Sequence, residues 1–345
     1  MKGTFVLQFL EMPGLRDTPF SILELATVGK DSGPGGALRD TLRVAQKAEE
    51  FGFSRFWLAE HHNMVSIASS ATAVLIGQVA AATKKIRVGS GGIMLPNHSP
   101  LIVAEQFGTL GHLFPNRIDL GLGRAPGTDQ VTANAIRSDR MQATHHFPHE
   151  IEKIQEYFSV DNKDAAVRAT VAEGVDVPIW ILGSSTDSAH LAAAKGLPYA
   201  FASHFSSAQL FDALNIYYNN FKPSAQLEAP KAMACINVIV ADTQEEAERL
   251  FTTLIKRFLG IITNQRDYME PPEEMTPELR EMAQHPAFQR MLKYTFVGTK
   301  ERVKAQTEEF LESTRVEELM VVSHMYSTED RVKSIRLFSE VMKGK

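Results

Sequence analysis

A carboxylate and two histidines stand next to one another at Glu60, His61 and His62. Such a group could bind a metal, as histidine pairs do in barrel hydrolases. Adjacent residues of a strand point to opposite faces, however, so one metal could rarely take both histidines. We therefore favour an acid–base role for one histidine, oriented by the neighbouring carboxylate.

A second group of residues could hold an anion. Gly183, Ser184 and Ser185 precede a predicted helix, and Ser188 lies in its first turn. Backbone N–H groups and the helix dipole favour a phosphate at such a position. An ordinary helix cap has the same pattern. Arg124 follows a predicted strand, where it could contact a phosphate or form an ion pair with a carboxylate.

Two predicted strands end in glycine, at Gly91-Gly92 and Gly121-Leu122-Gly123. Glycine lets the backbone approach a flat ligand closely, although tight turns also use it. These glycines do not form a dinucleotide-binding fingerprint. That motif needs a glycine-rich turn after the first strand, where this chain has Glu11-Met12-Pro13.

The segment from His145 to Glu150 contains a further histidine cluster. Pro148 argues against a helical metal site, so we interpret the segment as a loop at the rim of the pocket. Cys235 cannot form an internal disulfide. It lies in an apolar run that predicts a buried, inert thiol and is consistent with the cytoplasm.

The rest of the chain predicts the scaffold that would position these residues. Strands alternate with helices, which favours a parallel (β/α)8 TIM barrel in one domain, residues 1–345. Residues 11–36 read as a loop, and 260–294 as an insertion between strands seven and eight and a candidate lid. The predicted strands are 4–10, 54–59, 86–88, 118–123, 177–182, 199–202, 232–240 and 319–322.

Active sites of such barrels lie at the C-terminal ends of the strands, where all these polar residues fall, together with His204 after strand six. Met94, Leu95 and Phe205 could line the pocket, although core packing would explain them equally well. The chain has 345 residues, with 36 Lys and Arg against 41 Asp and Glu. Its net charge of −5 indicates no nucleic-acid partner, and no apolar run is long enough to cross a membrane.

Several segments resemble the bacterial luciferase-like flavin-dependent monooxygenases, and their order and spacing hold across nearly the whole chain. They are Phe56-Trp57-Leu58-Ala59-Glu60-His61-His62-Asn63, Val88-Gly89-Ser90-Gly91-Gly92-Ile93-Met94-Leu95-Pro96, Ala104-Glu105-Gln106, Arg117-Ile118-Asp119-Leu120-Gly121-Leu122-Gly123-Arg124-Ala125-Pro126-Gly127 and Leu182-Gly183-Ser184-Ser185.

The resemblance implies a site for FMN. It places the phosphate at Arg124, Ser184, Ser185 and Ser188. It also implies a cis peptide bond without proline at Gly91-Gly92, under the flavin ring, and a His61 that faces the flavin, with Glu60 beside it and His62 in a structural role. The cofactor-binding residues that we expect are Gly91, Gly92, Met94, Arg124, Gly183, Ser184, Ser185 and Ser188.

The resemblance also implies a mechanism. Reduced FMN would come from a separate NAD(P)H:flavin reductase and react with O2 to give a C4a-peroxyflavin. That species would oxygenate an organic substrate, such as a long-chain aldehyde. Relatives often form homodimers, and we expect one here. Two alternatives remain open, an F420-dependent hydride-transfer enzyme on the same barrel and a flavin-binding protein without turnover.

Overall fold

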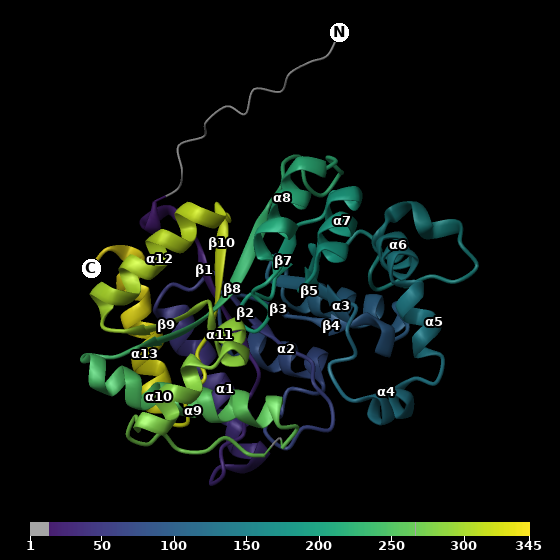
Figure 1. Cartoon of the computed structure of the whole chain (residues 1–345). Coiled ribbons are helices and arrows are strands. Elements are labelled where there is room, and N and C mark those ends of the chain that lie inside the picture. The colour runs from purple at the N-terminus through teal and green to yellow at the C-terminus, as the bar shows by residue number, and fades with distance from the viewer. Residues whose placement is uncertain (1–13, 266) are drawn as a thin grey trace.

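The computed structural model describes residues 14–265 and 267–345. Within them, eight parallel strands form the barrel, and it closes because β10 pairs with both β1 and β8. This confirms the predicted fold (Figure 1). The barrel strands are β1 (Phe20–Glu24), β2 (Arg55–Leu58), β3 (Arg87–Ser90), β5 (Ile118–Gly123), β6 (Ile179–Gly183), β7 (Tyr199–Phe201), β8 (Ala232–Val240) and β10 (Glu318–Val322).

The first barrel strand corrects the sequence interpretation. The strand predicted at 4–10 lies outside the described residues, and β1 occupies part of the predicted loop 11–36. All five residues of β1 are buried. The prolines and glycines on either side concealed this short apolar run. The helix after it also begins inside the predicted loop, at Gly33, because Pro34 in its first turn needs no N–H partner.

Helices cover the outside of the barrel (Figure 1). The longer helices are α1 (Gly33–Glu50), α2 (Thr72–Ala82), α3 (Pro100–Leu113), α6 (Phe147–Phe158), α7 (Thr186–Lys195), α8 (Leu210–Asn220), α9 (Gln244–Ile262), α12 (Lys300–Thr314) and α13 (Thr328–Lys343). The described residues contain no helix long and apolar enough to cross a membrane.

Shorter elements fill the connections at the C-terminal ends of the strands. The polar segment after β5 contains α4 (Gln130–Ile136) and α5 (Arg140–His145), which lie at the right in Figure 1. Residues 263–294 contain α10 (Pro277–Gln284) and α11 (Pro286–Leu292). That this segment is an insertion and a lid stays a prediction. Two short strands lie outside the barrel, β4 (Ile93–Met94) on β5 and β9 (Thr295–Gly298) on β8.

The barrel interior has an apolar part and, near the N-terminal ends of the strands, an ionic layer. The apolar part includes Trp57 and Trp180, whose rings pack edge to face with their centroids 5.3 Å apart. In the ionic layer the Arg55 guanidinium lies 2.6 Å from Asp119 and 2.9 Å from Glu318. This closes the N-terminal end of the barrel and leaves its C-terminal end for a ligand.

Candidate functional site

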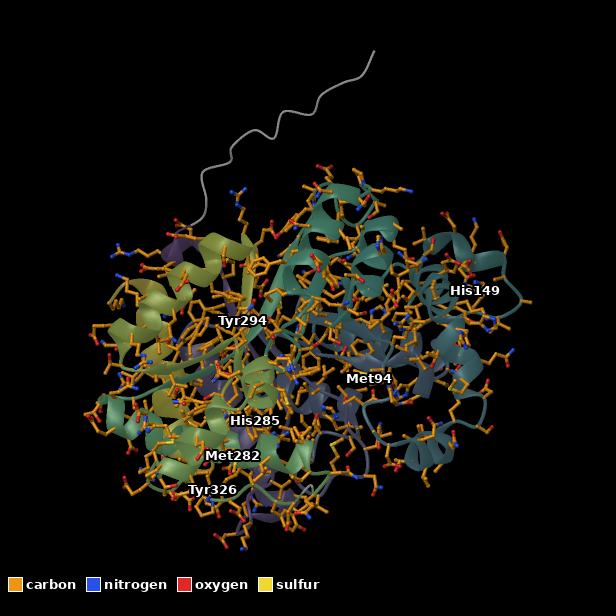
Figure 2. The ribbon with its side chains drawn as sticks, viewed as in Figure 1. Met94, His149, Met282, His285, Tyr294 and Tyr326 are labelled. Carbon is orange, nitrogen blue, oxygen red and sulfur yellow. The ribbon has the colours of Figure 1, made fainter. Side chains whose placement is uncertain are left out.

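A cavity of about 430 Å³, here called the first cavity, lies at the C-terminal end of the barrel. All ten residues that we predicted for the site line it, although they come from five separate strand ends. Met94, one of them, lies near the centre of the molecule in Figure 2. The ten are Glu60, His61, Gly91, Gly92, Met94, Arg124, Gly183, Ser184, Ser185 and Ser188.

One wall of the first cavity is bare backbone. A Cβ atom on Gly91 would lie 2.5 Å from the Leu23 side chain, and one on Gly92 would lie 2.2 Å from that of Leu182. Only glycine fits at either position. The peptide bond between Gly91 and Gly92 is cis, as the resemblance implies. The wall therefore offers a flat surface on which a planar ring could lie.

The start of α7 forms the second part of the cavity. Ser185 is the N-cap residue, but its side chain does not cap the helix. The Ser188 hydroxyl donates to the Ser185 carbonyl at 2.7 Å and lies 3.0 Å from the Tyr199 hydroxyl. Ser188 thus holds the turn in place. The first-turn N–H groups, which no side chain caps, remain available for an anion.

Arg124 lies across from this helix start and forms an ion pair with Asp187, at 3.1 Å. This is the carboxylate pairing that the sequence left open. The two side chains are 48% and 68% exposed, and exposed pairs of this kind contribute only about 0–1 kcal/mol. A phosphate at the α7 N-terminus could therefore replace Asp187 as the partner of Arg124 at little cost.

His61 has a defined tautomer. Its Nδ1 lies 3.0 Å from the carbonyl oxygen of Gly127, which can only accept a hydrogen bond. Nδ1 therefore carries the proton, and Nε2 is the acceptor of the ring. Burial lowers the pKa of His61, with the nearby charge of Arg257 adding to the effect. The ring is neutral at neutral pH, which suits a group that accepts a proton.

Glu60 does not orient His61, and this corrects the sequence interpretation. Its carboxylate lies 3.0 Å from Nε2 of His62 and 2.9 Å from Nε2 of His98, and it accepts from the Met94 N–H at 3.0 Å. Burial alone would raise the pKa of Glu60, but the hydrogen bonds from His62 and His98 outweigh it and hold the pKa at about 2. We infer that Glu60 stays ionised and positions the cavity wall rather than transferring protons.

His98 escaped the sequence analysis because it lies 38 residues from Glu60 in the chain. The structural role expected for His62 agrees with its bond to Glu60. The cluster from His145 to Glu150 is different. Only Thr144, just before it, lines the first cavity, so the predicted rim position is wrong for the histidines. His149 lies on α6, apart from Met94 in Figure 2.

A second cavity, of about 600 Å³, adjoins the first. Leu25, His61, His204 and Phe205 line both cavities and form a common wall. The sequence analysis had no signal for this second cavity, because most of its lining comes from α9 and residues 263–270. In the part of the chain that the structure describes, no three His, Cys, Asp or Glu residues are placed to hold a metal.

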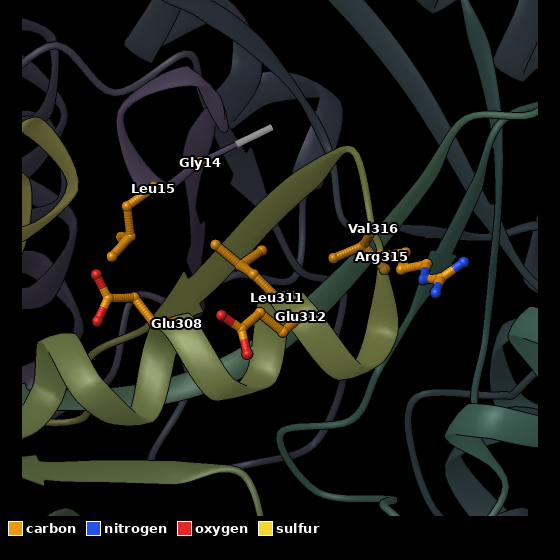
Figure 3. A pocket seen from close by; sticks show the side chains of 7 residues that line it. All are labelled: Gly14, Leu15, Glu308, Leu311, Glu312, Arg315 and Val316. Carbon is orange, nitrogen blue, oxygen red and sulfur yellow. The ribbon is translucent and has the colours of Figure 1, made fainter. Parts of the chain in front are cut away.

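Two further observations exclude a reactive cysteine and a second location for the predicted site. Cys235 lines the first cavity, but burial raises the pKa of its thiol, which makes it a poor nucleophile. A pocket of about 250 Å³ lies at the opposite end of the barrel, next to the residues that precede β1 and β10 (Figure 3). Leu15, Leu311 and Val316 line it with the carboxylates of Glu308 and Glu312. None of the predicted site residues lies there.

Several known proteins resemble this chain over most of its length. The chain is 44% identical over 322 residues to a luciferase-like monooxygenase of Escherichia coli (strain K12), covering 93% of this chain and 96% of the other. It is 38% identical over 235 residues to the N-acetyl-S-alkylcysteine monooxygenase of Bacillus subtilis (strain 168), covering 66% and 70%. The crystal structure of apo-MsnO8 superimposes with a TM-score of 0.86 at 31% identity, covering 94% and 98%.

Two more distant structures share the fold. One is the oxygenating constituent of 3,6-diketocamphane monooxygenase from Pseudomonas putida in complex with FMN, with a TM-score of 0.66, 15% identity and coverage of 95% and 98%. The other is an F420-dependent secondary alcohol dehydrogenase, with a TM-score of 0.68, 16% identity and coverage of 94% and 98%. Proteins of this fold therefore use FMN or F420.

The family described as luciferase-like monooxygenase matches residues 18–318, which run from just before β1 to the first residue of β10. The barrel and the ten residues around the first cavity all fall within that match or at its edge. The chain therefore belongs to the luciferase-like family of flavin-dependent monooxygenases.

Proposed function

We propose that this protein uses reduced FMN and O2 to oxygenate a small organic substrate. The observation that carries the proposal is the first cavity, in which a flat glycine wall, an uncapped helix start and a neutral histidine face one space. A planar ring with a phosphate on a flexible arm needs the first two features. Proton transfer beside that ring needs the third.

The described residues fit FMN. Gly91 and Gly92 leave room for the ring, because neither adds a side chain of its own to that wall. The N–H groups at the start of α7 would hold the phosphate, together with the guanidinium of Arg124 once it leaves Asp187. Ser184 and Ser185 would add hydroxyl donors, while Ser188 keeps the turn in shape.

When bound, reduced FMN supplies the two electrons that let one oxygen atom of O2 enter the substrate while the other leaves as water. Around that chemistry, His61 would hold and return a proton at Nε2, since the Gly127 carbonyl fixes its proton at Nδ1. The buried side chains of Trp57, Met233 and Met320 would exclude water from the reacting group.

The electrons would come from outside this protein, from a separate NAD(P)H:flavin reductase. Arg124 is the one Lys or Arg among the described residues that line the first cavity. One cation and one helix start suit the single phosphate of FMN better than the two phosphates of a nicotinamide dinucleotide. The protein would therefore bind FMN that another enzyme has already reduced.

We also propose a homodimer that forms through α2 and α3. Val74 on α2, and Ile102 and Leu113 on α3, are large apolar side chains that are exposed on the described surface. A second copy of the chain would cover them. Analytical ultracentrifugation should show a dimer that Leu113→Glu weakens, and a wild-type monomer at micromolar concentration would contradict this part of the proposal.

The experiment that tests the function measures binding and turnover together. Fluorescence titrations with FMN, riboflavin and F420 should show the tightest binding for FMN. Arg124→Ala should weaken FMN binding about 10-fold and leave riboflavin, which has no phosphate, unchanged. With a general flavin reductase, NADH and 18O2, a panel of aldehydes, thioethers and ketones should give a product that carries one labelled oxygen atom. Preference for F420, or the lack of label in any product, would overturn the proposal.

A further inference from the structure

The second cavity has an inner wall that carries nitrogen-bearing side chains from four parts of the chain. His61 follows β2, His204 follows β7, and His324 follows β10. Arg257 joins them from the middle of α9. Because His61 and His204 also line the first cavity, this wall stands beside the position proposed for the flavin ring.

Two of the three histidines of this wall, His204 and His324, are buried, and His61 is half-buried. His204 is only 9% exposed, and burial lowers its pKa to about 3, with nearby His61 and Arg257 adding to the effect. Burial also lowers the pKa of His324 well below its ordinary value. Among the residues that the structure describes, no group bonds to Nδ1 of His204. A buried polar atom in that state is uncommon and indicates that a ligand completes its hydrogen bonding.

The positive and negative charges of the second cavity lie on different sides of it. Arg257 lines the same cavity as the three histidines, and its positive charge lowers the pKa of each of them. The described carboxylates that line the cavity, Asp267 and Glu270, are exposed and so belong to its solvent side. Glu270 lies 3.5 Å from Lys256, which balances its charge. The inner wall is therefore the cationic end.

Between these two ends the cavity is mainly apolar. Its apolar lining follows β1 and β7, continues through the loop before α2, and includes α9 and the segment after α9. Representative side chains are Leu25, Ile67, Phe205, Phe258 and Met291. An occupant that satisfies both parts has one anionic group and an apolar body.

We infer that the second cavity binds the organic substrate and that this substrate is an amphipathic carboxylate. Its carboxylate lies against Arg257, His204 and His324, and its apolar chain runs toward α9 and residues 268–291. The inference rests on the proposed function, since it names the substrate class of that reaction. Because the cationic wall adjoins the first cavity, the oxygenated atom lies within a few bonds of the carboxylate.

The test measures binding without flavin, so that it does not depend on turnover. Isothermal titration calorimetry compares octanoate, 1-octanol and octylamine, which share one apolar chain and differ in the charge of the head group. Wild type should bind octanoate about 10- to 100-fold more tightly than 1-octanol, the range expected for a charge-assisted contact in a buried site. Octylamine should bind most weakly.

Arg257→Gln should remove most of the preference for octanoate and change 1-octanol binding less than about twofold, since the apolar lining is intact. Arg257→Lys, which keeps the charge, should keep part of the preference, and it guards against a glutamine variant that fails to fold. Arg249→Gln is the matched control on the same helix and should leave the preference unchanged, because Arg249 pairs with Glu246 and lines neither cavity.

Equal binding of octanoate and 1-octanol by wild type, or a preference that survives Arg257→Gln, would overturn the inference. These outcomes leave the proposed function untouched, because FMN binding and 18O incorporation are measured separately. Conversely, a protein that binds octanoate through Arg257 but incorporates no label with any substrate would refute the monooxygenase and keep the anion site.

Discussion

His204 should make this protein sensitive to mild acid. Its ring is buried, and its pKa is about 3 in the folded protein against an ordinary 6.5. A lowered pKa means that the unfolded chain binds a proton before the folded protein does, so the free energy of unfolding falls as the pH drops below 6.5. Between pH 7 and pH 5 this one ring should cost about 2 kcal/mol.

That free-energy difference does not depend on how far the pKa of His204 in the folded protein lies below 5. Any value well below 5 leaves the folded ring neutral over the whole interval, so the loss is set by the titration of the unfolded chain alone. The change to test is His204→Gln, which removes the titrating group and keeps a side chain able to form hydrogen bonds. Whatever stability the substitution costs at pH 7 cancels, because the measured quantity is the difference between the two pH values.

The assay is urea unfolding at pH 7 and at pH 5, followed by tryptophan fluorescence, with free energies from linear extrapolation. Wild type should lose about 2 kcal/mol more than His204→Gln over this interval. The matched control is His190→Gln, because the ring of His190 on α7 is exposed. This substitution should leave the loss in unfolding free energy between pH 7 and pH 5 the same as in wild type. Equal losses for wild type and His204→Gln would refute the reasoning and show that the folded protein protonates His204 near its ordinary pKa.

Three further results are expected. His61→Ala should leave FMN affinity nearly unchanged but lower product formation by about 10²-fold, with hydrogen peroxide released instead. An unchanged ratio of product to peroxide would show that His61 only lines the cavity and transfers no proton. Gly183→Ala would place a Cβ 1.9 Å from the Ser188 hydroxyl, so FMN affinity should fall about 10-fold. The double variant with Ser188→Gly should recover part of that loss, because it relieves the clash but also removes the bond that Ser188 donates to the Ser185 carbonyl; no recovery would show that the clash lies elsewhere. Arg55→Met removes the cation that Asp119 and Glu318 share, although Arg87 still pairs with Asp119 at 2.6 Å and Lys231 still lies 3.8 Å from Glu318. It should cost about 3 kcal/mol in urea unfolding, against under about 1 kcal/mol for Arg43→Met in an exposed pair; equal costs would contradict the importance of burial.

The barrel could be predicted because its signals are local and repeat along the chain. Continuous apolar runs such as Ala232–Val240 are typical of strands buried on both faces, and the structure has β8 at these residues. The sequence analysis missed β1 because this strand carries no such local signal. Five residues between Pro19 and the following loop are too few to show a period, and only the pairing of β1 with β2 and β10 reveals them as a strand.

The first cavity could be predicted because most of the residues predicted for it lie at or just after the end of a strand, and parallel strands end at the same face of a barrel. The partners of those residues could not. Glu60 has His61 beside it in sequence, yet its carboxylate bonds to His98 across the cavity wall. Arg257 lies within a long amphipathic helix, where an arginine usually faces solvent. Its place in the second cavity depends on how α9 packs, which no local pattern encodes.

The wall shared by the two cavities has a thermodynamic consequence. Leu25, His61, His204 and Phe205 line both cavities, so a molecule bound in one cavity would change the surface that the other presents. Reciprocity then holds between them: if bound FMN changes the dissociation constant of a carboxylate by some factor, the carboxylate changes that of FMN by the same factor. A flavin titration in the presence of octanoate would thus report on the second cavity without any product being formed.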